Sequence, residues 1–334
     1  MDDKILLAHG SGGKLTHDLI KNLLVQELGN PCLNLLDDAA SFTLNGRIAF
    51  TTDSYVISPL FFPGGDIGKL AVCGTVNDLS MVGAVPKYVS LALIIEEGFL
   101  LNDLKRVVFS IHTTAQEADV EVVTGDTKVV NRGSADKLFI NTAGIGIIPD
   151  GVAISGSNIK SGDKIILSGP LGDHGIAILC QREGLKFETT LESDCAPLNK
   201  LVADMLGASN KIHALRDPTR GGLASTLNEF AESSKVGITI EEDKIPVRDT
   251  VRAACELLGF DPLYVANEGK LVAVVDSQAA EKVLSKMQKS EQGTQAAIIG
   301  EVVADHPGKV VMKTQFGSSR IISMLAGELL PRIC

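Results

Sequence analysis

The sequence predicts an α/β protein of the α+β type, built from two mixed α/β domains. Its 334 residues, 45% of them hydrophobic, are enough for two domains that each bury a core. Strand-like and helix-like stretches follow one another without the regular strand–helix–strand order of a Rossmann fold. A turn at residues 149–151 divides the chain near its middle. We therefore expect domains at 1–150 and 151–318, followed by a mobile tail at 319–334.

Apolar periodicity places the elements of the first half. We expect helices at 14–28, 67–84 and 102–118, and strands at 47–56, 89–96, 120–123 and 137–148. The strand at 120–123 is expected to open into a loop at 124–128. The helix at 67–84 is apolar but contains Asn77 and Asp78. A carboxylate in such surroundings is costly to bury unless it is paired or holds a metal.

The second half is predicted in the same way. We expect strands at 164–167, 271–275, 297–303 and 309–313, and helices at 197–206, 251–258 and 278–288, with two more after the Gly-rich turns 169–175 and 216–223. His174 stands where the first of these two helices begins. The sequence leaves two interpretations of it open, a catalytic base or a residue that caps the helix.

Composition excludes several classes of function. The net charge of −10 argues against a nucleic-acid partner, because binding a polyanion directly needs clustered Lys and Arg. No apolar run reaches the roughly 18 residues that a membrane span needs. The acidic start at residues 1–4 lacks a hydrophobic signal core, so a cytoplasmic location is expected. Six scattered cysteines form no CxxC pair, which excludes a zinc knuckle on spacing.

Residues 9–14, His-Gly-Ser-Gly-Gly-Lys, look like a phosphate-binding loop. They are not a Walker A motif, since that pattern needs Gly at position 8 and Ser or Thr at 15, where this chain has Ala8 and Leu15. A flexible Gly-rich segment before a helix can still cover an anion. The alternative is a simple linker, and both interpretations stay open.

Four aspartates, Asp38, Asp53, Asp78 and Asp126, lie at or near the ends of predicted elements. Carboxylate oxygens suit Mg²⁺, which bridges substrate phosphates and keeps several waters. Such an ion would let an acidic protein bind ATP. The alternative is four ordinary turn or N-cap aspartates.

The last residue, Cys334, carries a free thiol after an apolar stretch at 324–330. This stretch is long enough to dock on a domain and carry the thiol with it. The alternative is a plain tail, since chain termini are often frayed.

Six motifs together resemble one family along the whole chain, the HypE proteins of nickel–iron hydrogenase maturation. They are His9-Gly10-Ser11-Gly12-Gly13-Lys14, Thr52-Asp53-Ser54-Tyr55-Val56, Gly125-Asp126-Thr127-Lys128-Val129-Val130, Asp217-x-Thr219-Arg220-Gly221-Gly222, Asn267-Glu268-Gly269-Lys270 and the terminal Pro331-Arg332-Ile333-Cys334. The terminal motif is very specific. The family belongs to the superfamily of aminoimidazole ribonucleotide synthetase and selenophosphate synthetase. The resemblance implies N-terminal strands that pair across a homodimer and ATP in a cleft between the domains.

The resemblance also implies an activity. A partner carbamoyltransferase, HypF, places a carbamoyl group on the terminal thiol. The enzyme, a carbamoyl dehydratase, then uses ATP to convert this thiocarboxamide into a thiocyanate. The cyano group passes to iron on the HypC–HypD complex and becomes a cyanide ligand of the hydrogenase.

The resemblance also implies roles for single residues. Cys334 is expected to be the attachment site, Glu268 the base that takes protons from nitrogen, and Lys128 the group that stabilises the leaving oxygens. The resemblance implies Mg²⁺ ligands at Asp38, Asp53, Asp78 and Asp126. It implies nucleotide contacts at Asp53, Thr127, Lys128, Asn77, Asp126, Gly12, Gly13 and Arg220.

Two other functions share some of these features. Selenophosphate synthetase would want a Cys or selenocysteine in the Gly-rich loop, and residues 9–14 contain none, so it is set aside. A non-catalytic carrier that only presents a modified Cys334 is distinguished by whether the carbamoylated chain loses water on addition of Mg-ATP.

Overall fold

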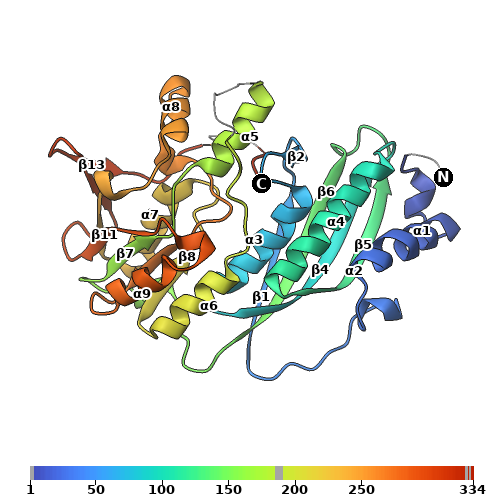
Figure 1. Cartoon of the computed structure of the whole chain (residues 1–334), viewed down its shortest axis with the longest axis horizontal. Helices are drawn as coiled ribbons and strands as arrows, with labels where there is room; N and C mark the ends of the chain where they lie inside the picture. Colours follow the sequence, from blue (N-terminus) through green and yellow to red (C-terminus); the bar gives the residue numbers. More distant parts are fainter. Residues whose placement is uncertain (1–3, 185–190, 328–329, 331) are drawn as a thin grey trace.

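The structure is a computed structural model that describes residues 4–184, 191–327, 330 and 332–334. Residues 1–3, residues 328–329 of the apolar stretch and Pro331 of the terminal motif therefore lie outside it. Two α/β units lie side by side along the longest axis (Figure 1). One is built on a four-stranded sheet and the other on a seven-stranded sheet. The predicted α/β fold with strands and helices in both halves is confirmed.

The first unit holds the N-terminal half of the chain. Its elements are η1 (Leu7–Gly10), α1 (Lys14–Leu19), η2 (Ile20–Val25), α2 (Gln26–Leu28), η3 (Leu33–Leu35), β1 (Arg47–Tyr55), β2 (Phe61–Phe62), β3 (Gly65–Asp66), α3 (Ile67–Met81), β4 (Val85–Glu96), α4 (Leu101–Ala118), β5 (Glu121–Val130) and β6 (Leu138–Ile148). The helix expected at 14–28 is present, with a π-helical middle at η2. The Asp66 carboxylate caps α3 by accepting hydrogen bonds from the amides of Gly68 and Lys69.

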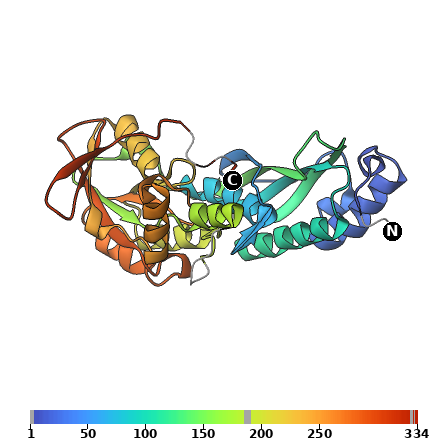
Figure 2. The ribbon, with the colours of Figure 1, turned by 90° about the horizontal axis from the view of Figure 1, so that it is seen from above.

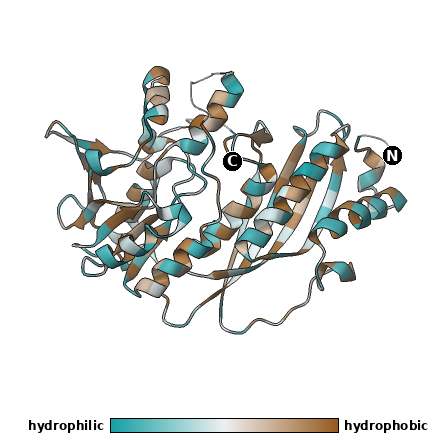
Figure 3. Ribbon diagram, viewed as in Figure 1, coloured by the Kyte–Doolittle hydropathy of each residue, from teal (hydrophilic) through white to brown (hydrophobic). Residues whose placement is uncertain are grey.

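The four strands lie in the order β1-β6-β4-β5, and only the β4–β5 pair is parallel. Helices α3 and α4 cover one face of this sheet, and among the described residues of the unit no helix lies over the middle of the other face (Figure 2). Residues on α4 that face the sheet recur every three or four positions, as a surface helix requires. Its outer side carries hydrophilic residues, whereas α3 is largely hydrophobic (Figure 3).

The prediction for β5 is wrong in one respect. The strand does not end at Val123 but continues to Val130, so residues 124–128 lie within it and form no loop. Parallel pairing with β4 continues past a register shift between Val89 and Ser90. Cross-strand pairing thus overrides the local turn preference of Gly125 and Asp126, because β-propensity depends strongly on context.

The second unit contains β7 (Lys164–Leu167), α5 (Asp173–Glu183), α6 (Asn199–Ala208), β8 (Ile212–Arg216), α7 (Gly222–Ser234), β9 (Gly237–Glu241), α8 (Asp249–Leu258), β10 (Val272–Val275), α9 (Ala280–Met287), β11 (Ala297–Val303), β12 (Val310–Lys313) and β13 (Ser319–Ile322). Strands β8, β9 and β13 were not predicted. Strand β13 pairs with β12, so residues 319–322, which the sequence assigned to the tail, form the edge of the sheet.

The seven-stranded sheet separates two hydrophobic cores. Side chains alternate between its faces, as in any strand. Ile165 and Leu167 of β7 therefore join the core under α7, while Ile166 joins the core under α6 and α9. Within the described residues, no helix is both long and apolar enough to cross a membrane.

The two units share a buried junction. The core of the first unit also contains Ile178 from α5, Cys195, Ala266 and the penultimate residue, Ile333. Asn77 on α3 crosses the junction: its amide nitrogen donates to the carbonyls of Ala196 (3.2 Å) and Glu268 (3.4 Å), and its oxygen accepts from the amide of Leu198 (2.8 Å). The C terminus thus ends inside the region where the units meet.

Candidate active site at the docked C terminus

Residues 332–334 dock along the segment that follows β1. The amide of Val56 donates to the Cys334 carbonyl at 3.4 Å, and the amide of Ser58 donates to the Arg332 carbonyl at 3.3 Å. The Arg332 guanidinium donates to the Val56 carbonyl at 2.9 Å and to the Asp136 carboxylate at 2.5 Å. These backbone and side-chain hydrogen bonds hold the terminal segment in place, although Arg332 has a left-handed backbone (φ 54°) and residues 332–334 form no strand. The docked interpretation of the tail describes this structure.

Helix α5 holds the same segment from the other side. His174 Nε2 lies 2.8 Å from the Ile333 carbonyl, and Arg182 donates to the Arg332 carbonyl. His174 is fully buried, and its side chain makes no capping bond to the start of α5. The capping interpretation is therefore wrong, because both ring nitrogens are engaged elsewhere, Nδ1 with Ser193 at 2.8 Å.

Cys334 lies at a pocket of about 380 Å³ whose lining includes Arg220, Tyr264 and Ala266. Burial, then the negative charge of Glu268, raise the pKa of the Cys334 thiol to about 12, although Arg220 acts in the opposite direction. The docked thiol is therefore neutral at physiological pH. A leaving or arriving group on this sulfur would face both Arg220 and Glu268.

The raised thiol pKa predicts that docking weakens in alkali. An undocked thiol ionises near its ordinary pKa of 9.0, while the docked thiol stays neutral up to about 12. The equilibrium constant for docking is thus independent of this ionisation below pH 9. It falls about tenfold per pH unit as the pH rises from 9 towards 12. The rate at which a carboxypeptidase removes the terminal residues measures this change. Cys334→Ser, which has no ionisable thiol, provides the control and should lack the added loss; equal pH dependence in both chains would contradict the prediction.

Glu268 lies on the buried loop 267–270. It is 3% exposed, and within the described structure its Oε1 atom has no hydrogen-bond partner. Burial, followed by Cys195 and Asp217, raises the pKa of its carboxyl well above the ordinary value. The loop itself is held firmly, since the amides of Glu268 and Gly269 both donate to the Asp194 carboxylate at 3.2 Å. The loop 267–270 therefore holds the Glu268 carboxyl, with its Oε1 atom free of hydrogen bonds to any described residue, close enough to the Cys334 thiol to raise its pKa.

The neighbouring acids Asp53, Asp78 and Asp217 extend this site towards β1 and α3. Thr51 donates to the Asp78 carboxylate at 2.8 Å, and burial raises the pKa of Asp78. Burial and the charge of Asp78 raise the pKa of Asp217 to about 7, with a further contribution from Asp53. Burial and mutual repulsion outweigh the nearby Arg216, which lowers the pKa of both Asp78 and Asp217. The half-buried carboxylates of Asp53 and Asp78 are oxygen ligands of the kind that Mg²⁺ takes.

The Gly-rich loop and β5 form a second candidate site. Gly12, Asp126, Thr127 and Lys128 line a cavity of about 440 Å³ beneath the loop. A Cβ atom at Gly10 would come within 2.5 Å of the Val129 nitrogen, so only glycine allows the loop to lie this close to the strand. This arrangement favours the lid interpretation over the linker, since the loop covers a pocket of nucleotide size. Gly13 follows in the same loop and caps α1 through its backbone.

One chain does not bring all of the predicted metal ligands together. Asp53 is opposite Thr142, which contacts Thr75 on α3, so Asp53 lies on the helix-covered face. Asp126 is opposite Ala92 and belongs to the other face. Their strands occupy opposite edges of the sheet, three strand spacings or about 14 Å apart.

The remaining predicted site residues are placed as follows. Asp38 lies exposed in the connection between η3 and β1. Asn77 uses its whole amide to join the two units, which leaves its nucleotide contact a prediction. Across the described residues, no group of three or more His, Cys, Asp or Glu is placed to hold a metal.

Sequence reasoning missed Arg182 and Asp194. Nothing in their local sequence distinguishes them from surface charges, because their partners are distant in the chain. Asp194 is paired with Lys270 at 3.1 Å; burial opposes its ionisation, but the charge of Lys270 and hydrogen-bond donors such as the Glu268 amide prevail and lower its pKa. The Asn-Glu-Gly-Lys motif contained one hint, since a buried Lys270 requires a carboxylate partner.

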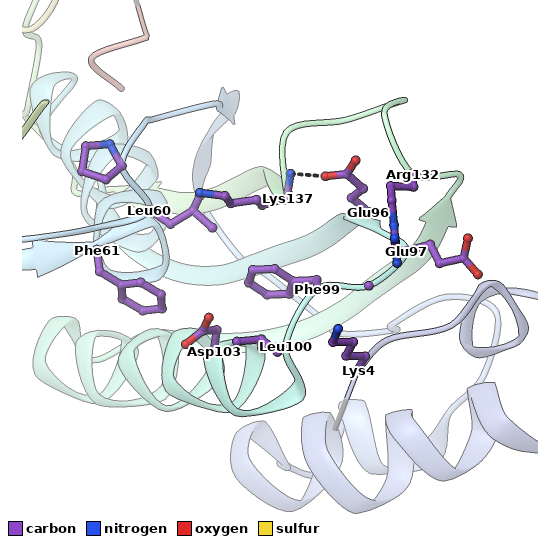
Figure 4. A pocket seen from close by; sticks show the side chains of 12 residues that line it. Lys4, Leu60, Phe61, Glu96, Glu97, Phe99, Leu100, Asp103, Arg132 and Lys137 are labelled. Atoms are coloured by element: carbon purple, nitrogen blue, oxygen red, sulfur yellow. Dashed lines mark hydrogen bonds between the residues drawn. The ribbon is translucent and has the colours of Figure 1, made fainter. Parts of the chain in front are cut away.

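A pocket of about 460 Å³ beside β4 and α4 shares no lining residue with the other two (Figure 4). Lys4, Arg132 and Lys137 face it together with Glu96, Glu97 and Asp103 (Figure 4). The Glu96 carboxylate accepts a hydrogen bond from the Lys137 amide at 2.9 Å. Its charges balance internally, so it points to no particular ligand.

Comparison with known proteins identifies related chains over the full length. The family described as AIR synthase related protein, N-terminal domain, matches residues 36–148, and the corresponding C-terminal domain family matches residues 160–313. A carbamoyl dehydratase HypE of Azotobacter vinelandii is 55% identical over 98% of this chain and 96% of its own. The HypE of Escherichia coli strain K12 is 47% identical over 99% and 100%.

Solved structures agree with this likeness. A crystal structure of hydrogenase maturation protein HypE in complex with ATP superposes with a TM-score of 0.96 at 50% identity, covering 98% of this chain and 99% of that one. A crystal structure of a HypE–HypF complex superposes with a TM-score of 0.82 at 49% identity, covering 92% of this chain and 99% of that one.

Proposed function

Since the chain belongs to the HypE family of carbamoyl dehydratases, we propose that it dehydrates an S-carbamoyl group on its own Cys334 to a thiocyanate, using ATP, and so supplies the cyanide ligand of hydrogenase iron. The observation that carries this proposal is the docked terminus. Cys334 lies in a pocket between the units that Arg220 also lines. The Glu268 carboxyl, whose Oε1 atom has no hydrogen-bond partner among the described residues, raises the pKa of the Cys334 thiol. A plain tail would need none of these contacts.

The chemistry fits these residues. An amide oxygen is a poor leaving group, and phosphoryl transfer from ATP makes it a good one. Cys334 holds the carbamoyl group as part of the substrate. Glu268 takes a proton from the nitrogen. The raised pKa makes its ionised form a stronger base than an exposed carboxylate, and a cation near Asp53 would favour that ionised form.

We assign Mg²⁺ to Asp53 and Asp78, because the charge of Asp53 adds to the raised pKa of Asp78 even though Arg216 lies close by. The ion would neutralise phosphate oxygens during transfer. Asp126, Thr127 and Lys128 would contact the nucleotide together with Gly12 and Gly13 of the loop, and Lys128 would stabilise the departing oxygens. Asp38 lies exposed between η3 and β1, so it would join these metal ligands only after that segment moves towards them.

We propose a homodimer that unites the two candidate sites. The uncovered face of the N-terminal sheet exposes Ile48 (51%), Phe50 (68%), Val85 (42%) and Ile94 (40%), more apolar surface than a monomer usually leaves in water. Both β1 and β5 are edge strands of this sheet. Packing of two such faces would bury Asp126 of each copy between them, with the edge strand β1 and its Asp53 at the border of the same interface. Sedimentation at micromolar concentration tests this assembly.

HypF is the proposed carbamoyl donor partner, in keeping with the related HypE–HypF complex. We further propose the HypC–HypD complex as the acceptor of the cyano group and the cytoplasm as the location. The domain limits at 150 and 318 likewise remain predictions.

The activity is tested by mass spectrometry of the C-terminal peptide. The carbamoylated chain should lose one water when Mg-ATP is added and none without it. A chain that binds ATP, keeps the carbamoyl group intact and hands it to a partner would instead be a carrier, and the dehydratase proposal would be wrong.

Replacing Asp78 by Asn should weaken Mg-ATP binding by at least about tenfold, because an amide has lost the charge that attracts the ion. The amide oxygen still accepts the hydrogen bond from Thr51, so the fold should persist. Calorimetric titration with and without Mg²⁺ measures the effect. Asp243→Asn, an exposed position in the second unit, serves as the matched control. Unchanged affinity for Mg-ATP would contradict the metal assignment.

A further inference from the structure

Helix α5 contacts the terminal segment at two points on one side. His174 at its start meets the Ile333 carbonyl at 2.8 Å, and Arg182 near its end donates to the Arg332 carbonyl and to the carbonyl of Ser58. The two residues are eight positions apart, slightly more than two helical turns, so their side chains leave α5 in similar directions. Both contacts are to main-chain oxygens of the tail.

The hydrogen bonds and burial together indicate the state of His174. A carbonyl can only accept, so Nε2 carries the hydrogen and donates to Ile333. In the neutral ring that the lowered pKa of His174 favours, Nδ1 is an acceptor and the Ser193 hydroxyl donates to it at 2.8 Å. The Ser193 oxygen in turn accepts from the Cys195 amide at 3.1 Å. The ring also packs edge-on against Phe62.

Every polar atom of this histidine is therefore used. No nitrogen of the ring remains to exchange a proton with a group on Cys334. Burial lowers the pKa of His174, which agrees with a neutral ring. These contacts exclude the catalytic base interpretation for the docked state.

We infer that α5 is a latch for the tail: His174 and Arg182 hold the main chain at residues 332 and 333 and thereby position the Cys334 sulfur, whatever group that sulfur carries. This inference rests on the proposed function, in which the tail docks with a modified sulfur. Because neither contact reaches the Cys334 side chain, the latch does not distinguish a thiol from a thiocarboxamide or a thiocyanate. A change in the group or charge on the sulfur therefore acts on docking through the pocket around Cys334, and not through these two contacts.

The latch is tested by the alkylation rate of Cys334 in the full-length chain. Iodoacetamide labels the C-terminal peptide, and mass spectrometry follows it without ATP or any partner. His174→Phe keeps the ring shape but removes the donor, and Arg182→Met removes the other contact. We expect each to raise the labelling rate at least about tenfold, since an undocked thiol is exposed and ionises more readily.

Two controls separate positioning from general loosening. Arg252→Met removes an exposed arginine of α8 and should leave the rate unchanged. His174→Gln retains a donor for the Ile333 carbonyl and should return the rate most of the way to that of the parent chain. If His174→Phe fails to fold, Arg182→Met alone decides the question.

The inference is overturned if Arg182→Met, and His174→Phe where it folds, label Cys334 at the parental rate. Failure of the proposed function would look different. The parent chain would still protect Cys334 from iodoacetamide, but its carbamoylated form would never lose water when Mg-ATP is added. Where both hold, the single-turnover rate of water loss should fall only in a variant whose labelling rate approaches that of a fully exposed thiol, because only then is the docked form the minority.

Discussion

Cys334→Ala should abolish thiocyanate formation while ATP affinity stays within about twofold of the parent. The sulfur is the atom that receives the carbamoyl group, so its loss removes the reactant itself. Nucleotide binding should survive because Cys334 does not line the cavity under the Gly-rich loop, where Gly12 and Lys128 are found. Calorimetry with ATP and mass spectrometry of the C-terminal peptide after incubation with carbamoyl donor provide the two measurements.

The matched control is Cys180→Ala, which removes another half-buried thiol, from α5. That variant should form thiocyanate at nearly the parental level. If the Cys334→Ala chain still yields a carbamoylated or cyanated peptide, or still supports iron cyanation in the cell, the sulfur is not the site of the reaction. The proposed function would then be wrong at its central step.

Glu268→Gln should slow water loss by on the order of 10²- to 10⁴-fold, the usual range for removing a positioned general base. Glutamine has the size of glutamate but accepts a proton poorly. The variant should still dock its tail and accept the carbamoyl group, because loop 267–270 is held through backbone amides that bond Asp194. Carbamoylated chain should therefore accumulate when Mg-ATP is present.

A second measurement on the same variant does not depend on turnover. The charge of Glu268 is among the causes that raise the pKa of Cys334, so its removal should lower that pKa from about 12 towards the ordinary value. The pH dependence of tail docking would shift accordingly. Glu192→Gln, an exposed acid in the segment that contains Asp194, should alter neither quantity. Full turnover by Glu268→Gln would remove this residue from the mechanism.

Several elements could be predicted from sequence because their signals are local. The strands at 164–167 and 297–303 have the predicted bounds, and the apolar helix that carries Asp78 is confirmed. The prediction for β5 is too short because Gly125 and Asp126 favour a turn locally, whereas pairing with β4 keeps them extended. Strands β8 and β9 were missed, although each is buried in the finished sheet.

The candidate site, too, was predictable only in part. Motifs singled out Glu268 and Cys334, and the structure places both where the two units meet. The same kind of motif grouped Asp53 with Asp126, which the sheet separates to opposite faces and edges. Sequence order carries no information on which face a strand residue occupies relative to a distant strand, since that depends on register.

By itself, the sequence determined the fold class and the family, because composition, periodicity and motifs are properties of neighbouring residues. Only the tertiary structure decided that the terminus is docked, that Glu268 is left unpaired beside it, and that His174 and Arg182 hold its main chain. These contacts join residues more than 50 positions apart. Their existence depends on how the two units pack, and burial there sets the charge state of each group.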